Sequence, residues 1–207
     1  MPILPLILLL SLNGLLLASS ADAGQFAYQG FAAANLTMDG LAVVMPNGLL
    51  ALTNFTSQEK GHAFHPAPLR FLNTTASSTA VARSFSASFV FAIVSVVDGL
   101  SDQGLAFVVA PTSDLSSANG GQYLGLLNAT NGTASDHILA VELDTIWNPE
   151  LSDINSNHVG INVNSLISRQ AKPAGYYADD DGMAFRDLML NSRRPMQVWV
   201  DYDAQAR

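Results

Sequence analysis

Residues 141–163 read VELDTIWNPELSDINSNHVGINV, and this stretch is the most informative in the chain. Its two ends alternate apolar with polar residues, which predicts two β-strands joined by a polar loop. Alternate residues of a strand share one face and lie about 6.5–7 Å apart, so Glu142 and Asp144 should point the same way. Two bare carboxylates held that close repel each other, and one would take up a proton unless a cation lay between them. The stretch therefore predicts a cation site beside a strand.

The loop itself offers further ligands. By folding back it can bring Asn148, Asp153 and His158 to the same point. Carboxylate, amide and carbonyl oxygens suit Ca2+, whereas a histidine nitrogen beside carboxylates suits a transition metal such as Mn2+. A polar turn without metal is the better explanation for any one or two of these residues. The complete set, framed by strands, favours a loop that binds two metal ions.

This spacing resembles the metal-binding signature of the legume-type (L-type) lectins. In that family the Asp of Val-Glu-(Leu/Phe)-Asp-Thr is followed by Asn four, Asp nine and His fourteen positions later, and then by Gly-Ile-(Asp/Asn)-Val-Asn-Ser. The chain has each of these residues between 141 and 165. The run AFHPAPL at residues 63–69 is most similar to the ectodomains of plant lectin receptor kinases. The resemblance covers about residues 26–203 and implies an all-β, jelly-roll sandwich.

The resemblance also implies roles for the acidic loop. Asp144 and Asp153 would bridge the two ions, and Ser168 matches a position that holds a metal-bound water. The remaining ligands would be Glu142 and His158 for Mn2+, with Asn148 and the backbone carbonyl of Ile146 for Ca2+.

The implied sugar pocket departs from the family pattern. Gln103 stands where the family has an Asp that accepts hydrogen bonds from two sugar hydroxyls. Gln122 replaces a Gly, Ile146 replaces an aromatic ring, and Asn148 is as expected. Glutamine has one acceptor oxygen and no charge, which makes it a weaker acceptor for paired hydroxyls. We predict a lectin domain with a carbohydrate or glycan ligand. The alternative is a receptor ectodomain fragment that binds a non-sugar ligand or a partner protein.

A catalytic interpretation has less support. Glu-x-Asp on a jelly-roll strand also occurs in a class of β-glucan hydrolases, whose retaining mechanism needs two closely placed carboxyl groups. The third acid of that class would fall near Trp147, and Glu150 lies too far along the chain. We therefore predict that the chain is not an enzyme.

The first residues are typical of a secretory signal. An apolar run at residues 3–18 precedes the small-x-small motif at 21–23, so residues 1–23 should be cleaved and residues 24–207 should form the domain. The run is short for a membrane span, and no later segment could span a bilayer. Sequons support a secreted protein, or the outer face of the plasma membrane for a longer receptor. They begin at Asn35, Asn54, Asn73, Asn128 and Asn131.

Composition narrows the possible partners. The net charge of −8 would repel phosphate backbones, so no nucleic acid is expected. The chain has no cysteine, and a sandwich of this size does not need disulfides.

Shorter patterns give further expectations. Alternation at residues 85–93 and 198–202 predicts strands, and Asn47-Gly48 and Asp39-Gly40 are typical of hairpin turns. We expect an acidic loop at residues 174–182. Three further histidines, with no ligand partners nearby in sequence, are expected in turns or at the surface: His62, His65 and His137.

The last residue is Arg207, close after the predicted strand at residues 198–202. Family members continue for several more strands, so we expect a domain whose C-terminal strands are missing. An open sheet edge exposes unpaired backbone groups, which favours poor solubility or a homodimer.

Overall fold

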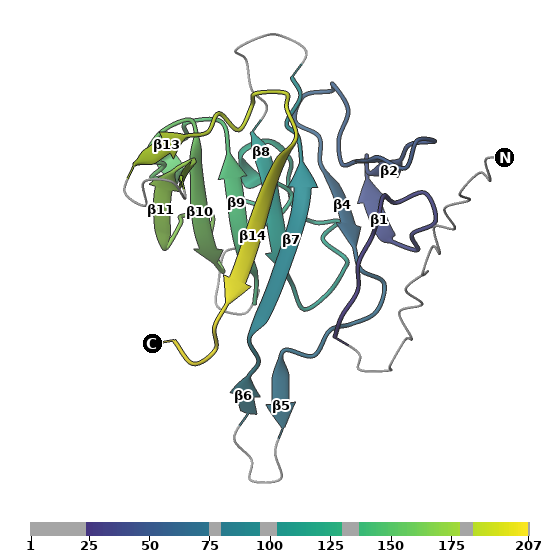
Figure 1. Ribbon diagram of the computed structural model, residues 1–207. Coiled ribbons are helices and arrows are strands. Elements are labelled where there is room, and N and C mark those ends of the chain that lie inside the picture. Colours follow the sequence, from purple (N-terminus) through teal and green to yellow (C-terminus); the bar gives the residue numbers. More distant parts are fainter. Residues whose placement is uncertain (1–23, 75–79, 96–102, 130–136, 179–183, 207) are drawn as a thin grey trace, which may run out of the picture.

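The computed structural model describes residues 24–74, 80–95, 103–129, 137–178 and 184–206. Nearly all regular structure within these ranges is β (Figure 1). Two short 3-10 turns, η1 (Gly121–Tyr123) and η2 (Pro149–Leu151), are the only helical elements among the described residues. The strands are β1 (Thr37–Gly40), β2 (Val43–Val44), β3 (Leu50–Ala51), β4 (Gly61–Phe64), β5 (Leu72–Thr74), β6 (Ala80–Ala82), β7 (Phe85–Phe91), β8 (Gly104–Val109), β9 (Leu139–Asp144), β10 (His158–Val163), β11 (Gln170–Pro173), β12 (Gly175–Tyr177), β13 (Phe185–Asp187) and β14 (Met196–Tyr202).

A four-stranded antiparallel sheet in the order β11-β10-β9-β8 forms the centre of the molecule. Its register puts Leu143 of β9 between Leu105 of β8 and Val159 of β10. One residue along, Glu142 lies between Ala106 and Gly160. Because successive side chains point to opposite faces, this sheet has one apolar face and one face that carries Glu142 and Asp144.

The apolar face packs against a second layer, made by β7 and β14. Figure 1 shows β14 and β7 crossing in front of β8 and β9. The rings of Phe85 and Phe89 lie 6.3 and 6.2 Å from that of Phe107, centroid to centroid. Along β7 the odd-numbered residues are half-buried and the even-numbered residues exposed, as the alternation predicted. The inner face of this sandwich is centred on Leu143, Ala174 and Leu190.

The opposite face of the sheet is covered by an irregular segment, residues 113–127. Leu115, Leu126 and Leu127 are buried there against Ala140 of β9. Lys60 ties the segment down by donating to the carbonyls of Leu115 (3.2 Å) and Ser116 (2.6 Å). The acidic side chains on this face are therefore buried beneath a loop rather than spread over an open surface.

The two predicted hairpin turns had different outcomes. Asn47-Gly48 does join β2 to β3, so that prediction is confirmed. Asp39-Gly40 begins a turn, in which the Ala42 amide donates to the Asp39 carbonyl (3.4 Å), but not a hairpin, because β1 pairs with β4. Gly40 is needed for close strand approach: it has φ +63°, and a Cβ there would come within 2.3 Å of the Lys60 carbonyl oxygen.

The acidic loop expected at residues 174–182 is in part a strand. Gly175, Tyr176 and Tyr177 form β12, which pairs with β13. Aromatic side chains favour extended backbone, which the loop prediction overlooked. Residues 179–182 lie outside the described part of the chain.

Within the described ranges no helix is long and apolar enough to cross a membrane.

Candidate metal centre

The polar loop connects two paired strand ends. β9 ends at Asp144 and β10 begins at His158, and these two residues face each other across the ladder. Between them the chain is shaped by the loop's own carboxylates. Asp144 Oδ1 accepts a hydrogen bond from the Ile146 amide (2.7 Å), and Asp153 Oδ2 accepts one from the Asn148 amide (2.7 Å). The loop is thus folded around its acidic side chains.

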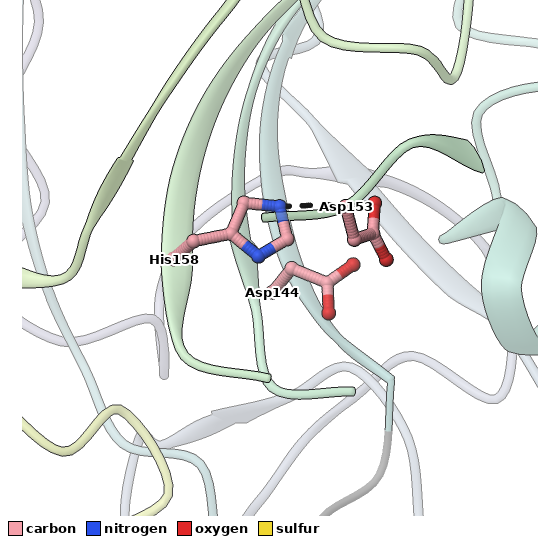
Figure 2. A group of neighbouring side chains, drawn as sticks. All are labelled: Asp144, Asp153 and His158. Carbon is pink, nitrogen blue, oxygen red and sulfur yellow. Dashed lines mark ion pairs between the residues drawn. The ribbon is translucent and has the colours of Figure 1, made fainter. Parts of the chain in front are cut away.

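Figure 2 shows Asp144, Asp153 and His158 turned toward one another. One candidate ligand atom from each lies within 4.8 Å of the others. His158 Nε2 is 3.9 Å from Asp153 Oδ1 and 3.4 Å from Glu142 Oε1. Glu142 and Asp144 are each 3% exposed and His158 is 1% exposed. A buried group of three carboxylates and one imidazole is costly to maintain without a compensating cation.

Two buried polar atoms in the group lack a hydrogen-bond partner in the described part of the chain. His158 Nδ1 lies 2.8 Å from the Asn155 carbonyl oxygen, which fixes the proton on Nδ1 and leaves the Nε2 lone pair facing the carboxylates. Among the described residues, His158 Nε2 and Asn148 Oδ1 are buried without any hydrogen-bond partner. Buried polar atoms are nearly always satisfied, and these are the kinds of donor that a metal ion satisfies. The residues present therefore fit a bound cation.

Glu142 is held by two residues behind the cluster. Its Oε2 accepts a hydrogen bond from Asn162 Nδ2 (2.6 Å), and its Oε1 lies 2.6 Å from Ser168 Oγ. A Cβ at Gly160 would come within 2.3 Å of Glu142 Oε1 and 2.0 Å of Ser168 Oγ. Glycine at this position therefore provides the space in which the Glu142 and Ser168 side chains form their contact. Sequence analysis missed Asn162, which is 1% exposed. Its place on the same face of β10 as His158 was the signal that could have found it.

Burial and mutual repulsion dominate the electrostatics of the metal-free cluster. Burial, with the negative charges of Asp153 and Glu142, raises the pKa of Asp144 to about 7. Burial also raises the pKa of Asp153. Burial alone would lower the pKa of His158, but Glu142, the Asn155 carbonyl and Asp144 raise it.

Glu142 behaves differently from its neighbours. Burial would raise its pKa, yet the adjacent His158 ring and the hydrogen bonds from Ser168 and Asn162 together lower it. One carboxylate of the group is therefore stabilised as the anion by protein alone, while Asp144 and Asp153 are not.

The residues of the predicted sugar pocket are partly brought together. Asn148 Nδ2 donates to Gln122 Oε1 at 3.4 Å, so the η1 turn lies against the acidic loop. The Gln103 carbonyl accepts a hydrogen bond from the Thr145 amide (3.2 Å). Gln103 Oε1 is a third buried atom without a partner among the described residues. Ile146 is half-buried beside them.

His62 is not the turn or surface residue that was expected. It is buried in β4, and its Nδ1 is hydrogen-bonded to Asp39 Oδ1 of β1. Its Nε2 lies 2.8 Å from the Gly125 carbonyl oxygen, just beyond the η1 turn. His65 is half-buried as well and stacks on Phe26, whereas His137 is exposed as predicted. The partners of His62 come from remote parts of the sequence, so no local pattern revealed them.

The sequons differ in accessibility. Asn35 and Asn54 are exposed. Asn128 is half-buried, and its amide donates to the Ser117 carbonyl at 3.2 Å. Asn73 lies in β5, and Asn131 lies outside the described residues.

The chain is similar to known proteins in both sequence and structure. The sequence profile described as "Legume lectin domain" matches residues 23–207. A protein of Oryza sativa subsp. japonica, the L-type lectin-domain containing receptor kinase SIT1, is 55% identical over 205 residues. That match covers 98% of this chain and 30% of the relative, so the chain spans less than a third of its length.

Solved structures agree on the fold. Peanut lectin with a 9mer peptide superposes with a TM-score of 0.68 at 28% identity, over 86% of this chain and 71% of that chain. The lectin from Bauhinia forficata in complex with GalNAc superposes with a TM-score of 0.64 at 28% identity, over 86% and 72%. These likenesses confirm the predicted all-β jelly-roll sandwich.

Proposed function

The chain belongs to the legume lectin domain family, and on this basis we propose that it is a carbohydrate-binding domain whose site is organised by Ca2+ and Mn2+. The family's domain binds ligands and is not enzymatic. The single observation that carries the proposal is a pair of atoms able to ligate a metal, His158 Nε2 and Asn148 Oδ1. Both are buried within the carboxylate cluster without a hydrogen-bond partner from the residues that the structure describes. Two cations would satisfy both atoms and neutralise the surrounding carboxylates.

The proposed ligand sets divide the cluster between two ions. Bound cations would supply charge compensation and rigidity, so the loop would be ordered before any ligand arrives. Asp144 and Asp153 would bridge the ions, and Asn162 and Ser168 would hold Glu142 in place. The proposed ligands are Glu142, Asp144, Asp153 and His158 for Mn2+, with Asp144, Asn148, Asp153 and the Ile146 carbonyl for Ca2+.

The sugar would be bound beside the Ca2+ position. Asn148 can present its amide to a sugar hydroxyl once its Oδ1 is engaged by the ion. Gln122 and Gln103 would add one acceptor and one donor group each, without charge. This supports a neutral carbohydrate or glycan as the ligand.

The proposed setting is extracellular. Residues 1–23 would be a cleaved signal peptide and residues 24–207 the lectin domain, either secreted or on the outer face of the plasma membrane. Exposed Asn35 and Asn54 support glycosylation at these sites better than Asn128, whose amide is already engaged.

A receptor ectodomain fragment that binds a non-sugar ligand or a partner protein is a second candidate. The observation that favours it is the contact between Asn148 Nδ2 and Gln122 Oε1, which engages a group that would otherwise face the sugar. Two relatives of the chain are named receptor kinases, and the chain covers about 30% of the length of each.

The experiment is elemental analysis combined with glycan-array binding, both with and without a chelator. We expect Ca and Mn in the purified chain, and glycan binding that disappears when both ions are removed. Material that is offered both cations and retains neither would refute the metal centre. A chain that holds both ions and binds no glycan would favour the second candidate.

A further inference from the structure

Lys60 lies immediately before β4 and is one of two lysines in the chain. Its ammonium donates to three backbone carbonyls of the covering segment (residues 113–127), those of Leu115 (3.2 Å), Ser116 (2.6 Å) and Ala118. An ammonium group has three N–H donors, and here each has an acceptor. An ordinary surface lysine keeps its ammonium in water, whereas this half-buried side chain spends it on the protein.

The three carbonyls form a cation site that the chain fills by itself. They come from four consecutive residues, and backbone carbonyl oxygens are common ligands of cations in proteins. Ala118 is 6% exposed, so its carbonyl needs a donor from the protein, and Lys60 supplies one. Hydrogen bonds from Ser116, together with the charge of Lys60, lower the pKa of the neighbouring Asp114 carboxyl. A negative charge therefore adjoins the carbonyl site as well.

A second anchor follows two residues later. His62 Nε2 lies 2.8 Å from the Gly125 carbonyl oxygen, at the far end of the covering segment. A Cβ at Gly120 would come within 2.2 Å of the Gln58 carbonyl oxygen, so the segment lies directly on the chain that precedes β4. The two anchors, Lys60 and His62, therefore hold the segment on both sides of the η1 turn.

The turn between the anchors carries Gln122. Its Oε1 accepts a hydrogen bond from Asn148 Nδ2 (3.4 Å), while Asn148 Oδ1 is buried at the metal centre. The oxygen and nitrogen of an amide group are rigidly joined, so holding the nitrogen fixes where the oxygen points. Partners that orient a metal ligand affect metal affinity although they do not touch the ion.

We propose that Lys60 is the resident cation of a carbonyl site at residues 115–118, and that it thereby positions Gln122 and the Asn148 amide at the metal centre. The ligand class of this site is an alkylammonium ion, which the lysine side chain supplies. The positioning role rests on the proposed function, whereas the carbonyl site does not depend on bound metal. Lys60 is a positioning residue, because it acts on Asn148 through the covering segment and Gln122.

Differential acetylation tests the carbonyl site without any metal or sugar. In the folded full chain, in chelator, acetic anhydride should modify Lys60 about tenfold more slowly than Lys172, because three charge-assisted hydrogen bonds must first open. Lys172 is the other lysine of the chain and is exposed in β11. In denaturant the two rates should become equal. Mass spectrometry measures both rates, and equal rates in the folded chain would overturn the carbonyl site.

Chemical rescue tests the positioning role. Lys60→Ala removes three carbon atoms and the ammonium, which n-propylammonium replaces in size and charge. In the presence of Mn2+, this variant should bind Ca2+ about tenfold more weakly than the wild type, and n-propylammonium should restore most of the loss. 1-Propanol, of the same size but uncharged, should restore nothing. Lys172→Ala, the matched control, should bind Ca2+ like the wild type and should not respond to n-propylammonium. Calorimetric titration measures all of these affinities.

Gln122→Ala separates the anchor from the group that it positions. This variant should also bind Ca2+ more weakly, by a similar factor, but n-propylammonium should have no effect on it. The double variant, Lys60→Ala with Gln122→Ala, should bind Ca2+ about as weakly as either single variant, because both substitutions act through the same contact with Asn148. Losses that simply add would overturn the route through Gln122.

The outcomes separate this inference from the proposed function. A Lys60→Ala variant that binds Ca2+ like the wild type, or whose loss n-propylammonium does not restore, overturns the positioning role and leaves the proposed function intact. Wild type that binds neither ion overturns the proposed function and the positioning role together, while slow acetylation of Lys60 would still support the carbonyl site. If Lys60→Ala does not fold, the acetylation rates of the wild type decide on the carbonyl site, and Gln122→Ala decides on the positioning of Asn148.

Discussion

Two buried histidines in this protein have opposite surroundings. His62 has an acceptor at each ring nitrogen, Asp39 on one side and the Gly125 carbonyl on the other. His158 has one such partner, and its Nε2 faces carboxylates without a hydrogen bond among the described residues. Both ring nitrogens of His62 are engaged within the protein, whereas His158 Nε2 is left for the proposed metal ion. Satisfaction of hydrogen bonds, rather than burial, distinguishes His62 from His158, the proposed metal ligand.

The largest effect is expected from Asp144→Ala, which removes the carboxylate proposed to bridge both ions. Affinity for Ca2+ and Mn2+ should fall together, each by about a hundredfold or more, since a charged ligand to both is lost. Elemental analysis and calorimetric titration measure this. Asp201→Ala, at an exposed aspartate of β14, is the matched control. Loss of only one ion would contradict the bridging geometry.

A pair of variants tests the contrast between His62 and His158. In chelator, His62→Gln should lower the free energy of unfolding by about 1–3 kcal/mol, because a buried hydrogen bond is lost and the Asp39 carboxylate loses its partner. His158→Gln should lower it by less, about 0.5–1.5 kcal/mol under the same conditions, since only the Nδ1 hydrogen bond to the Asn155 carbonyl is lost and Nε2 makes none within the described chain. Denaturant titration followed by circular dichroism gives both values.

With metals present, the larger effect should be that of the His158 variant, and it should be on metal binding. His62→Gln should retain both ions, while His158→Gln should lose Mn2+ affinity. If the two substitutions cost the same stability in chelator and leave metal content equal, the distinction between these histidines is wrong.

A smaller effect is expected from Gly160→Ala. Its methyl group would meet Ser168 Oγ and Glu142 Oε1, so the carboxylate would have to move. Affinity for Mn2+ should fall about tenfold, as is usual when the supports of a ligand are disturbed. Val163→Ala, further along β10 and exposed on the other face, is the control. Unchanged Mn2+ affinity with a folded protein would show that the space above Gly160 is not needed.

The smallest effect concerns pH. Burial, with the charges of Asp153 and Glu142, raises the pKa of Asp144 to about 7, and the pKa of His158 is raised as well. The folded metal-free chain therefore holds these protons more tightly than the unfolded chain, and this stability is lost as pH rises through the folded pKa values. In chelator, the melting temperature should be a few degrees lower at pH 8 than at pH 6.

Metal binding should show the opposite trend. The ligands must lose their protons to coordinate, so Ca2+ and Mn2+ affinity should rise several-fold from pH 6 to pH 8. Thermal unfolding at both pH values, with chelator and with both ions, measures the two trends. Trends of the same sign in both series would contradict the assignment, and Asp144→Asn should flatten the metal-free series.

Sequence predicted those parts of the molecule that depend on local pattern. The alternation around Phe85 and Phe89 sets which side of β7 is buried, and it was read correctly. The spacing from Glu142 to His158 brought the acidic cluster together, because its strands are adjacent hairpin partners. The hairpin predicted at Asp39-Gly40 was wrong because the turn there leads away from β1, whose partner is the more distant β4. The prediction for His62 was wrong because its hydrogen-bond partners lie 23 and 63 positions away in the sequence.

The order of strands along the chain has a consequence for how the protein is made. β9, β10 and β11 are consecutive and pair with one another, so their contacts close short loops, whereas β14 must return to β7 from far along the chain. Short-range pairing forms faster than long-range pairing. The β9–β10 hairpin can therefore form ahead of the sandwich, and Ca2+ at the proposed site would speed its folding. Refolding that is no faster with Ca2+ than with chelator would limit the ions to the finished protein.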